Sequence, residues 1–356
     1  MDVSEISNVV EEILDRLSSV IIGYREQSKL VLTALLANGH VLLEGVPGIA
    51  KTTMVRGVAR LIGLRDAVML EVNGIPYRGF TRIQFTPDLM PSDVTGSMVF
   101  NPATRDFEPR FGPVFSYLVL ADEINRAVPR TQSALLEAMQ ERQVTIGGVT
   151  YPLELRDRGK FFFVLATQNP VEQEGTYPLP EAQLDRFLMR IVMDYPRTLE
   201  TEKNIYRLHM YRLKEPIEDL EPVVEPRWVI EAQEVIARSV KVEEEALEYV
   251  TRLVRATRPS VFKPVAKYFE LGASPRAGIA LIRAAKAYAA VRGSGEAEIK
   301  DVDAVLFPVL NHRVLPNIER LVEEGVSGER HLTRYRVIKE GLSLVKKAVK
   351  QSSSLP

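Results

Sequence analysis

The stretch Glu44-Gly45-Val46-Pro47-Gly48-Ile49-Ala50-Lys51-Thr52-Thr53 decides the fold of this chain. A short apolar run at 41–43 precedes it and predicts a buried strand, and apolar residues at helical spacing follow it over 54–62. A strand, a glycine turn, a Lys-Thr pair and a helix together form the context of a phosphate-binding loop. The glycines let backbone N–H groups turn inward around an anion, and the helix N-terminus adds the positive end of its dipole. The stretch therefore predicts a nucleotide site, and an ordinary strand-to-helix turn is the alternative.

Two side chains of this stretch suit a phosphate site. Lys51 would reach the β- and γ-phosphates of a nucleotide, and Thr52 would place its hydroxyl on Mg²⁺. Ala50 stands where a second glycine is usual, and alanine is tolerable there if its φ is negative. The candidate nucleotide-contacting residues are Gly45, Val46, Pro47, Gly48, Ile49, Ala50, Lys51, Thr52 and Thr53.

Composition narrows the class of protein. The chain has 356 residues, 46% of them hydrophobic, which is enough for two domains with sizeable cores. Its net charge of −1 argues against a global basic field that would draw it to nucleic acid or anionic lipid. It contains no cysteine, which excludes disulfides and thiolate metal sites, and its four histidines are scattered.

The N-terminal segment gives no targeting signal. It is acidic rather than basic, and no run of about 18 apolar residues occurs anywhere in the chain. We therefore expect no signal peptide and no membrane span, and a cytoplasmic location.

Apolar runs alternate with helical patterns over residues 1–196, which predicts an α/β fold. Strands are expected at 41–43, 68–72, 117–121, 161–167 and 188–192. Continuous apolar strands separated by helices indicate a parallel sheet covered on both faces. After Pro196 the patterns become helical to the end of the chain, with a proline-containing linker near 214–226. The predicted division is an α/β domain at 1–196 and a helical domain at 197–356.

Polar side chains follow two of the predicted strands. Asp122 and Glu123 come directly after the apolar run 117–121, and Asn169 follows the run 161–167. Because ligands bind at the carboxyl ends of parallel strands, these residues should lie beside the glycine turn. Asp122 would serve Mg²⁺, Glu123 would polarise an attacking water, and Asn169 would orient it. The alternatives are a solvated acidic strand end and, for Asn169, a simple turn residue.

Two segments predict hairpins. Residues 96–111 hold half-alternating runs around a polar, proline-containing turn. Residues 143–152 hold β-branched residues on both sides of Gly147-Gly148, a specific signal for a two-residue turn. Either hairpin could equally be a surface ribbon without a function.

Two arginines are further candidates. Arg276 follows Ser274-Pro275, which predict the N-cap and first residue of a helix reaching to about residue 291. A cation in the first turn opposes the helix dipole unless an anion such as a phosphate lies near, and a surface ion pair is the alternative. Arg186, just before the last predicted strand, is from spacing alone more simply an Asp/Arg surface pair with Asp185.

Taken together, these residues resemble the MoxR family of AAA+ ATPases. The matching stretches are EGVPGIAKT (44–52), RIQFTPDLMPSD (82–93), LADEINR (120–126), QSALLEAMQERQVT (132–145), ATQNP (166–170), LPEAQLDRF (179–187) and GASPRAG (272–278). The resemblance is close over about 20–195, and the last stretch extends it into the helical part. Alanine before the lysine is typical of this family. The resemblance implies an AAA+ core with a C-terminal all-α lid.

The resemblance also implies a role for each candidate residue. Lys51 and Thr52 would be the Walker A pair, and Asp122 and Glu123 the Walker B metal ligand and base. Asn169 would be sensor 1, Arg276 the sensor 2 arginine of the lid, and Arg186 an arginine finger reaching a neighbouring subunit's ATP. Ile22 and Gly23 fall where related ATPases hold the adenine. The hairpin at 96–111 would be the helix-2 insert, and the one at 143–152 the pre-sensor-1 hairpin.

Assembly and partners follow from the same resemblance. An arginine finger given in trans implies a homo-oligomer, most simply a hexameric ring that uses ATP and Mg²⁺. Family members usually remodel protein clients with von Willebrand A-domain partners, during complex maturation or cofactor insertion. Two alternatives stay open: a nucleic-acid motor, which the near-neutral charge argues against, and a nucleotide-gated scaffold with little turnover.

Overall fold

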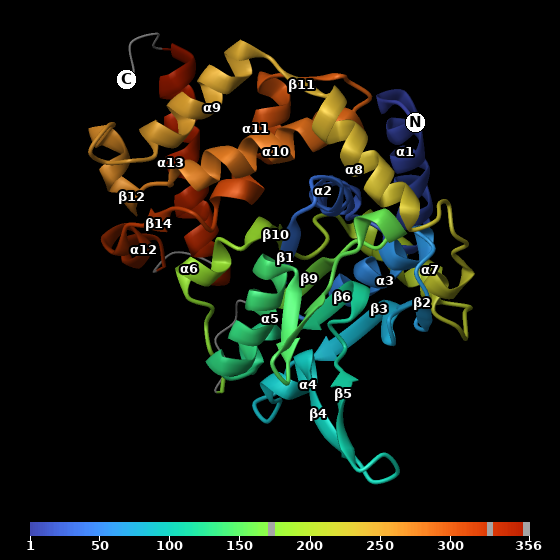
Figure 1. Cartoon of the computed structure of the whole chain (residues 1–356). Helices are drawn as coiled ribbons and strands as arrows, with labels where there is room; N and C mark the ends of the chain where they lie inside the picture. Colours follow the sequence, from blue (N-terminus) through green and yellow to red (C-terminus); the bar gives the residue numbers. More distant parts are fainter. Residues whose placement is uncertain (170–174, 326–329, 352–356) are drawn as a thin grey trace. The chain divides into compact units, whose positions relative to one another are not determined.

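The computed structural model describes residues 1–169, 175–325 and 330–351 (Figure 1). It divides into two compact units. The α/β unit comprises Asn8–Phe187 and Ile191–Glu234, and the helical unit comprises Met1–Ser7, Leu188–Arg190 and Val235–Pro356. The sequence analysis placed the boundary between the domains at residue 196, whereas residues 197–234 belong here to the α/β unit. The boundary at 196 stays a prediction.

A six-stranded sheet forms the centre of the α/β unit, in the order β10-β1-β9-β6-β3-β2. The strands are β1 (His40–Gly45), β2 (Val68–Val72), β3 (Ile75–Gln84), β6 (Ser116–Asp122), β9 (Phe163–Gln168) and β10 (Phe187–Met193). The pairs β1–β9, β6–β9 and β3–β6 are parallel, whereas β2 runs antiparallel to β3 at the edge. Every residue of β1 and β6 is buried, as expected for strands covered on both faces.

Helices flank the sheet, as Figure 1 shows. The helices with residues in the α/β unit are α1 (Val3–Val20), α2 (Arg25–Leu36), α3 (Lys51–Leu61), α4 (Pro91–Thr95), α5 (Pro129–Glu141), α6 (Glu181–Leu184), α7 (Leu199–His209) and α8 (Arg227–Ser239), of which α1 and α8 also extend into the helical unit. Helix α2 contacts β1, and α3 contacts β6. The mostly parallel sheet with helices confirms the α/β class expected from the sequence.

Strand β3 corrects the sequence-based expectation, which placed no strand at 75–84. Pro76, Gly79 and the charged Arg78 and Arg82 interrupt the apolar pattern of this stretch. The strand forms because its backbone pairs with β6 on one side and β2 on the other, and tertiary pairing overrides weak local propensity. As a result β2 is a half-exposed edge strand rather than a buried parallel one, and Val68 is 49% exposed.

Two hairpins extend from the α/β unit. β4 (Gly96–Asn101) pairs with β5 (Asp106–Phe111), and β7 (Gln143–Ile146) pairs with β8 (Val149–Pro152). Gly147 and Gly148 both have positive φ, 59° and 82°, as a type I′ turn requires. Figure 1 shows the β4–β5 ribbon extending away from the sheet.

A lysine is fully buried between the sheet and the segment that follows β8. Nζ of Lys160 donates to the carbonyls of Ser116 and Leu153. It lies over the rings of Tyr77 and Phe162, 4.9 and 5.3 Å from their centroids. Burial lowers the pKa of Lys160 well below 10.5.

The helical unit is built around α10 (Pro275–Val291), an alanine-rich helix that packs on α9 and α11. Its other elements are α9 (Glu244–Ala256), α11 (Ile299–Leu310), α12 (Ile318–Gly325), α13 (Arg330–Gln351) and the short strand pairs β11 (Lys241–Val242) with β13 (Glu296–Ala297) and β12 (Phe269–Leu271) with β14 (Leu315–Pro316). Among the described residues, no helix combines the length and the apolar character that a membrane crossing demands.

Candidate active site

The glycine turn is tight at one end and open at the other. A Cβ on Gly45 would lie 2.5 Å from the carbonyl oxygen of Met193 and 2.6 Å from Cδ1 of Ile49, so only glycine fits there. Gly48 has φ +80°, and a Cβ there would have nothing within 4 Å. The turn is therefore packed against the end of β10 at Gly45 and leaves open space beside Gly48, where an anion could approach the backbone.

Ala50 corrects a second expectation. It has φ +60° and ψ +23°, the left-handed conformation, and not the negative φ that the sequence argument required. Ala50 is the N-cap of α3, where the chain must turn from the glycine loop into the helix. An L-residue in this conformation costs about 1–2 kcal/mol, so the loop holds backbone strain directly before Lys51.

Lys51 points back across the turn. Its ammonium donates to the carbonyl oxygen of Gly45 and, at 3.2 Å, to that of Gln168 at the end of β9. Burial lowers the pKa of Lys51, and the nearby carboxylates of Asp122 and Glu123 act in the opposite direction. The side chain thus bridges β1 and β9 at the carboxyl edge of the sheet.

The two adjacent carboxylates lie at this same edge. Asp122 accepts a hydrogen bond at Oδ1 from the Thr167 hydroxyl, 2.6 Å, and at Oδ2 from Nε and Nη2 of Arg82, 3.0 and 2.6 Å. The Glu123 backbone N–H donates to the Thr167 hydroxyl at 2.9 Å, which ties both residues to β9. Glu123 is itself left-handed, with φ +56°.

A polar network connects the two carboxylates. Arg82 also donates to Oε1 of Gln84 at 2.7 Å, and the Gln84 amide donates to Oε2 of Glu123 at 2.9 Å. Arg126 forms an ion pair with the same oxygen of Glu123, with its Nε at 3.0 Å. Arg82 and Gln84 were not among the candidate residues because no strand was expected at 75–84, where proline, glycine and arginines obscure the strand pattern.

Asn169 directly follows β9, so it too lies at this edge. Its backbone carbonyl accepts a hydrogen bond from the Asn125 amide at 3.3 Å. Cα register places Glu44 beside Gln168, and Gln84 beside Asp122. The structure therefore brings the glycine turn, the Asp-Glu pair and Asn169 together. The motif at 166–170 ends at Pro170, which lies outside the described residues.

A cavity of about 230 Å³ opens beside the glycine turn. Ile22 lines it together with Gly48, Ile49, Ala50 and Thr53. Gly23, with φ +92°, lies under α7, since a Cβ there would be 2.8 Å from Cγ2 of Thr201. The segment around α7 supplies lining residues that the sequence argument did not anticipate, namely Tyr195, Ile205, Tyr206 and His209.

Arg186 lies at the amino end of β10, whereas the glycine turn lies at the carboxyl end of that strand. Arg186 occupies the turn between α6 and β10 and forms no ion pair with a described residue. Arg276 is an exposed residue in the first turn of α10, after the N-cap Ser274 and Pro275, and belongs to the helical unit. Helix α10 ends at Val291, where the sequence predicted it to end.

The residues at the edge fit a nucleotide with a divalent cation. The Thr52 hydroxyl and the Asp122 carboxylate are the hard oxygen ligands that Mg²⁺ takes, and Lys51 supplies a cation for phosphate. The open space at Gly48 leaves the loop backbone accessible to an anion.

Comparison with known proteins identifies the family. A family model described as "ATPase family associated with various cellular activities (AAA)" matches residues 40–189, and an AAA lid domain model matches residues 263–331. The chain is 43% identical to the uncharacterized protein YeaC of Bacillus subtilis, over 96% of this chain and 95% of YeaC. It is 39% identical to Chaperone MoxR1 of Mycobacterium tuberculosis, over 89% of this chain and 78% of that protein. The chain belongs to the MoxR family of AAA+ ATPases.

A solved structure agrees with this MoxR-family assignment. A crystal structure from Cytophaga hutchinsonii superposes with a TM-score of 0.77 at 39% identity, covering 94% of each chain. The AAA model falls on the α/β unit apart from part of β10, and the lid model falls inside the helical unit. An AAA+ core followed by a helical lid is therefore confirmed as the fold.

Proposed function

We propose that this MoxR-family chain hydrolyses ATP with Mg²⁺ at the interfaces of a ring, most simply a hexamer, and uses the energy to remodel protein complexes. The observation that carries the proposal is the position of Arg186, directly before β10. The Met193 carbonyl, at the carboxyl end of β10, lies against Gly45 of the glycine turn. Arg186 precedes the amino end of this strand of 7 residues, which spans about 20 Å.

This geometry favours a finger that acts in trans. Arg186 starts at the opposite edge of the sheet from its own glycine turn, and an arginine side chain is much shorter than the strand between them. A neighbouring subunit could present its Arg186 to the γ-phosphate, where a guanidinium stabilises the charge of the transition state. A subunit alone would lack that charge, so assembly and turnover should be coupled.

Within one subunit each residue has a defined task. Lys51 would donate to the β- and γ-phosphate oxygens, while Thr52 and Asp122 would hold Mg²⁺. A bound Mg²⁺ supplies neutralisation of phosphate charge. Glu123 would accept a proton from the attacking water and Asn169 would orient that water, while Arg276 would be the sensor 2 arginine of the lid. The cavity lined by Ile22 and the α7 segment is large enough to contribute to holding the adenine.

The catalytic assignment is tested by two substitutions. Lys51→Ala should abolish nucleotide binding, because the phosphates lose their cation. Glu123→Gln should bind ATP and assemble yet lose turnover by about 100-fold or more, the scale of general-base catalysis. Fluorescent-nucleotide titration and phosphate release measure the two steps. Turnover by Glu123→Gln close to that of the wild type would show that another group is the base.

The cellular role is proposed on family grounds. A relative at 39% identity is named a chaperone, which supports a protein client for this chain. We propose a von Willebrand A-domain protein as partner and the cytoplasm as location. Affinity capture with Glu123→Gln and ATP should retain that partner, with Lys51→Ala, which should not bind nucleotide, as the control. Capture that is equal for both variants would contradict a nucleotide-dependent complex.

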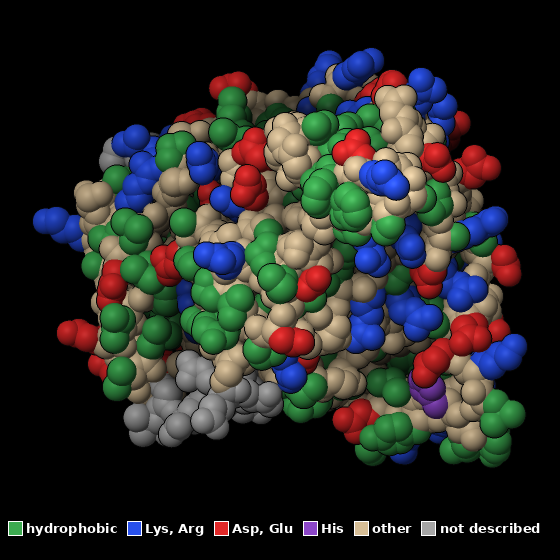
Figure 2. Space-filling view, turned by 60° about the horizontal axis from the view of Figure 1, so that its bottom comes forward, with side chains coloured by type: hydrophobic (Ala, Val, Ile, Leu, Met, Phe, Trp, Pro, Cys, Tyr) green, Lys and Arg blue, Asp and Glu red, His purple; other side chains and the backbone are tan. Residues whose placement is uncertain are grey.

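Surface charge gives no support to the nucleic-acid alternative. Figure 2 shows Lys and Arg side chains interspersed with Asp and Glu over one face, and the chain as a whole carries a net charge of −1. DNA-stimulated ATPase activity that falls steeply with salt would favour that alternative. A negligible rate of ATP hydrolysis by assembled rings in the presence of the partner would favour the other alternative, a nucleotide-gated scaffold.

A further inference from the structure

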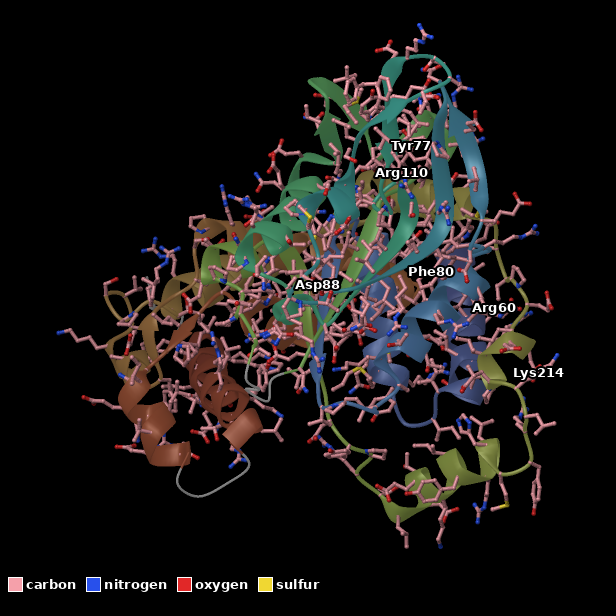
Figure 3. The ribbon with its side chains drawn as sticks, turned by 90° about the horizontal axis from the view of Figure 1, so that it is seen from below. Arg60, Tyr77, Phe80, Asp88, Arg110 and Lys214 are labelled. Carbon is pink, nitrogen blue, oxygen red and sulfur yellow. The ribbon has the colours of Figure 1, made fainter. Side chains whose placement is uncertain are left out.

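A second cavity lies on the α/β unit, with no lining residue in common with the cavity beside the glycine turn. It measures about 380 Å³, and its walls come from the C-terminal half of α3, the turn before β2, strand β3 and the segment at 220–222. The lining residues used below are Arg56, Arg60, Arg65, Asp66, Phe80 and Glu221. Arg60 on α3 and Phe80 on β3, both labelled in Figure 3, line this cavity.

Three arginines line this cavity. Arg56 and Arg60 are four residues apart on α3 and project from its half-exposed face, and Arg65 lies in the turn that follows. Within the described parts of the chain, none of the three guanidinium groups forms an ion pair. Arg60 donates only to a backbone carbonyl, that of Glu218 at 3.2 Å. Like charges at this helical spacing oppose helix formation, so an anion between them would relieve a repulsion.

The rest of the lining limits what can bind. Phe80 is 7% exposed and forms an apolar wall. Asp66 and Glu221 bring two negative charges, so the five charged side chains sum to +1 (three positive, two negative). A cavity of this size suits a small molecule rather than a folded partner.

We propose that this cavity binds a small anion with two or more phosphate or carboxylate groups. Guanidinium groups bind both kinds of oxyanion with paired, charge-assisted hydrogen bonds, and three of them suit a multiply charged ligand. The site is separate from the nucleotide: α3 begins at Lys51, and Arg60 lies nine residues further, about 13 Å along the axis. The proposal therefore stands whether or not the nucleotide assignment holds.

The test uses the full chain carrying Lys51→Ala, so that the glycine turn does not compete for phosphate. Inorganic pyrophosphate and citrate are titrated separately by calorimetry, as a polyphosphate and a polycarboxylate. At least one should bind at one site per chain, and Arg56→Gln with Arg65→Gln should weaken that binding about tenfold or more. Which probe binds distinguishes the phosphate source from the carboxylate source.

A matched control comes from the β4–β5 ribbon. Arg110 is exposed, does not line the cavity and lies apart from Arg60 in Figure 3, so Arg110→Gln makes the same charge change elsewhere. It should leave binding unchanged. If the double glutamine variant does not fold, Arg56→Lys with Arg65→Lys replaces it; this variant keeps the charge but loses the paired geometry, and should also weaken binding. Absence of saturable binding by both probes, or binding unaffected by the Arg56 and Arg65 substitutions, would overturn the proposal.

Discussion

Replacement of Ala50 by glycine should stabilise the α/β unit, although glycine usually destabilises. With φ +60°, Ala50 bears a left-handed cost of about 1–2 kcal/mol that glycine avoids. Glycine loses about 0.5–1 kcal/mol through the greater conformational freedom of the unfolded chain. The balance is a gain of roughly 0.5–1 kcal/mol, or about 2 °C in the midpoint of thermal unfolding for a unit of this size.

The assay is urea unfolding of Ala50→Gly beside a matched control, Ala67→Gly. Ala67 is exposed in the turn before β2 and is not among the described residues with positive φ. Ala67→Gly should therefore lose about 0.4–1 kcal/mol. The slope of the free energy of unfolding against urea should be the same in all three proteins, so that midpoints compare stability. Equal losses for both variants would refute the left-handed conformation at residue 50.

Three further substitutions test other contacts. Arg82→Gln removes both hydrogen bonds from the Arg82 guanidinium to Oδ2 of Asp122, which frees this oxygen for the metal. A Mg²⁺ titration of nucleotide binding should therefore show Mg²⁺ binding that is tighter by up to about fivefold, as expected for a half-exposed ion pair. Weaker Mg²⁺ binding would mean that Arg82 supports the metal site. Gly45→Ala places a Cβ 2.5 Å from the Met193 carbonyl and should lower stability by about 1–3 kcal/mol in thermal unfolding, and an unchanged midpoint would contradict this packing. Burial lowers the pKa of Lys160, so above that lowered pKa and below about 10.4 the unfolded chain binds a proton that the folded chain lacks, and stability rises with pH. The free energy of unfolding of the wild type should accordingly increase relative to that of Lys160→Met when both are measured first at about pH 7.5 and then at about pH 9.5. The same difference at both pH values would show that burial does not lower the pKa of Lys160.

Elements with a strong local pattern were predictable from the sequence. The apolar run at 41–43 became β1, and the Ser-Pro start of α10 was correct because an N-cap and a proline at the first helical position act locally. The common position of the glycine turn and the Asp-Glu pair was also predictable, because the carboxyl ends of parallel strands lie at the same edge of a sheet.

Features set by tertiary pairing were not predictable. Strand β3 depends on β6 and β2 for its hydrogen bonds, and its proline, glycine and arginines obscure the strand pattern. Arg82 and Gln84 were missed with it. The left-handed Ala50 was missed because a sequence gives residue types and not the path that connects the loop to α3.

In the proposed ring, a neighbouring subunit completes the ATP site. A mixture of two inactive variants tests this arrangement: Lys51→Ala keeps Arg186, and Arg186→Ala keeps the glycine turn. In a random equal mixture about a quarter of interfaces pair an intact nucleotide site with an intact Arg186, so ATP hydrolysis should return to about a quarter of the wild-type rate. Hydrolysis that stays as low as in the separate variants, although native mass spectrometry detects mixed assemblies, would contradict the claim.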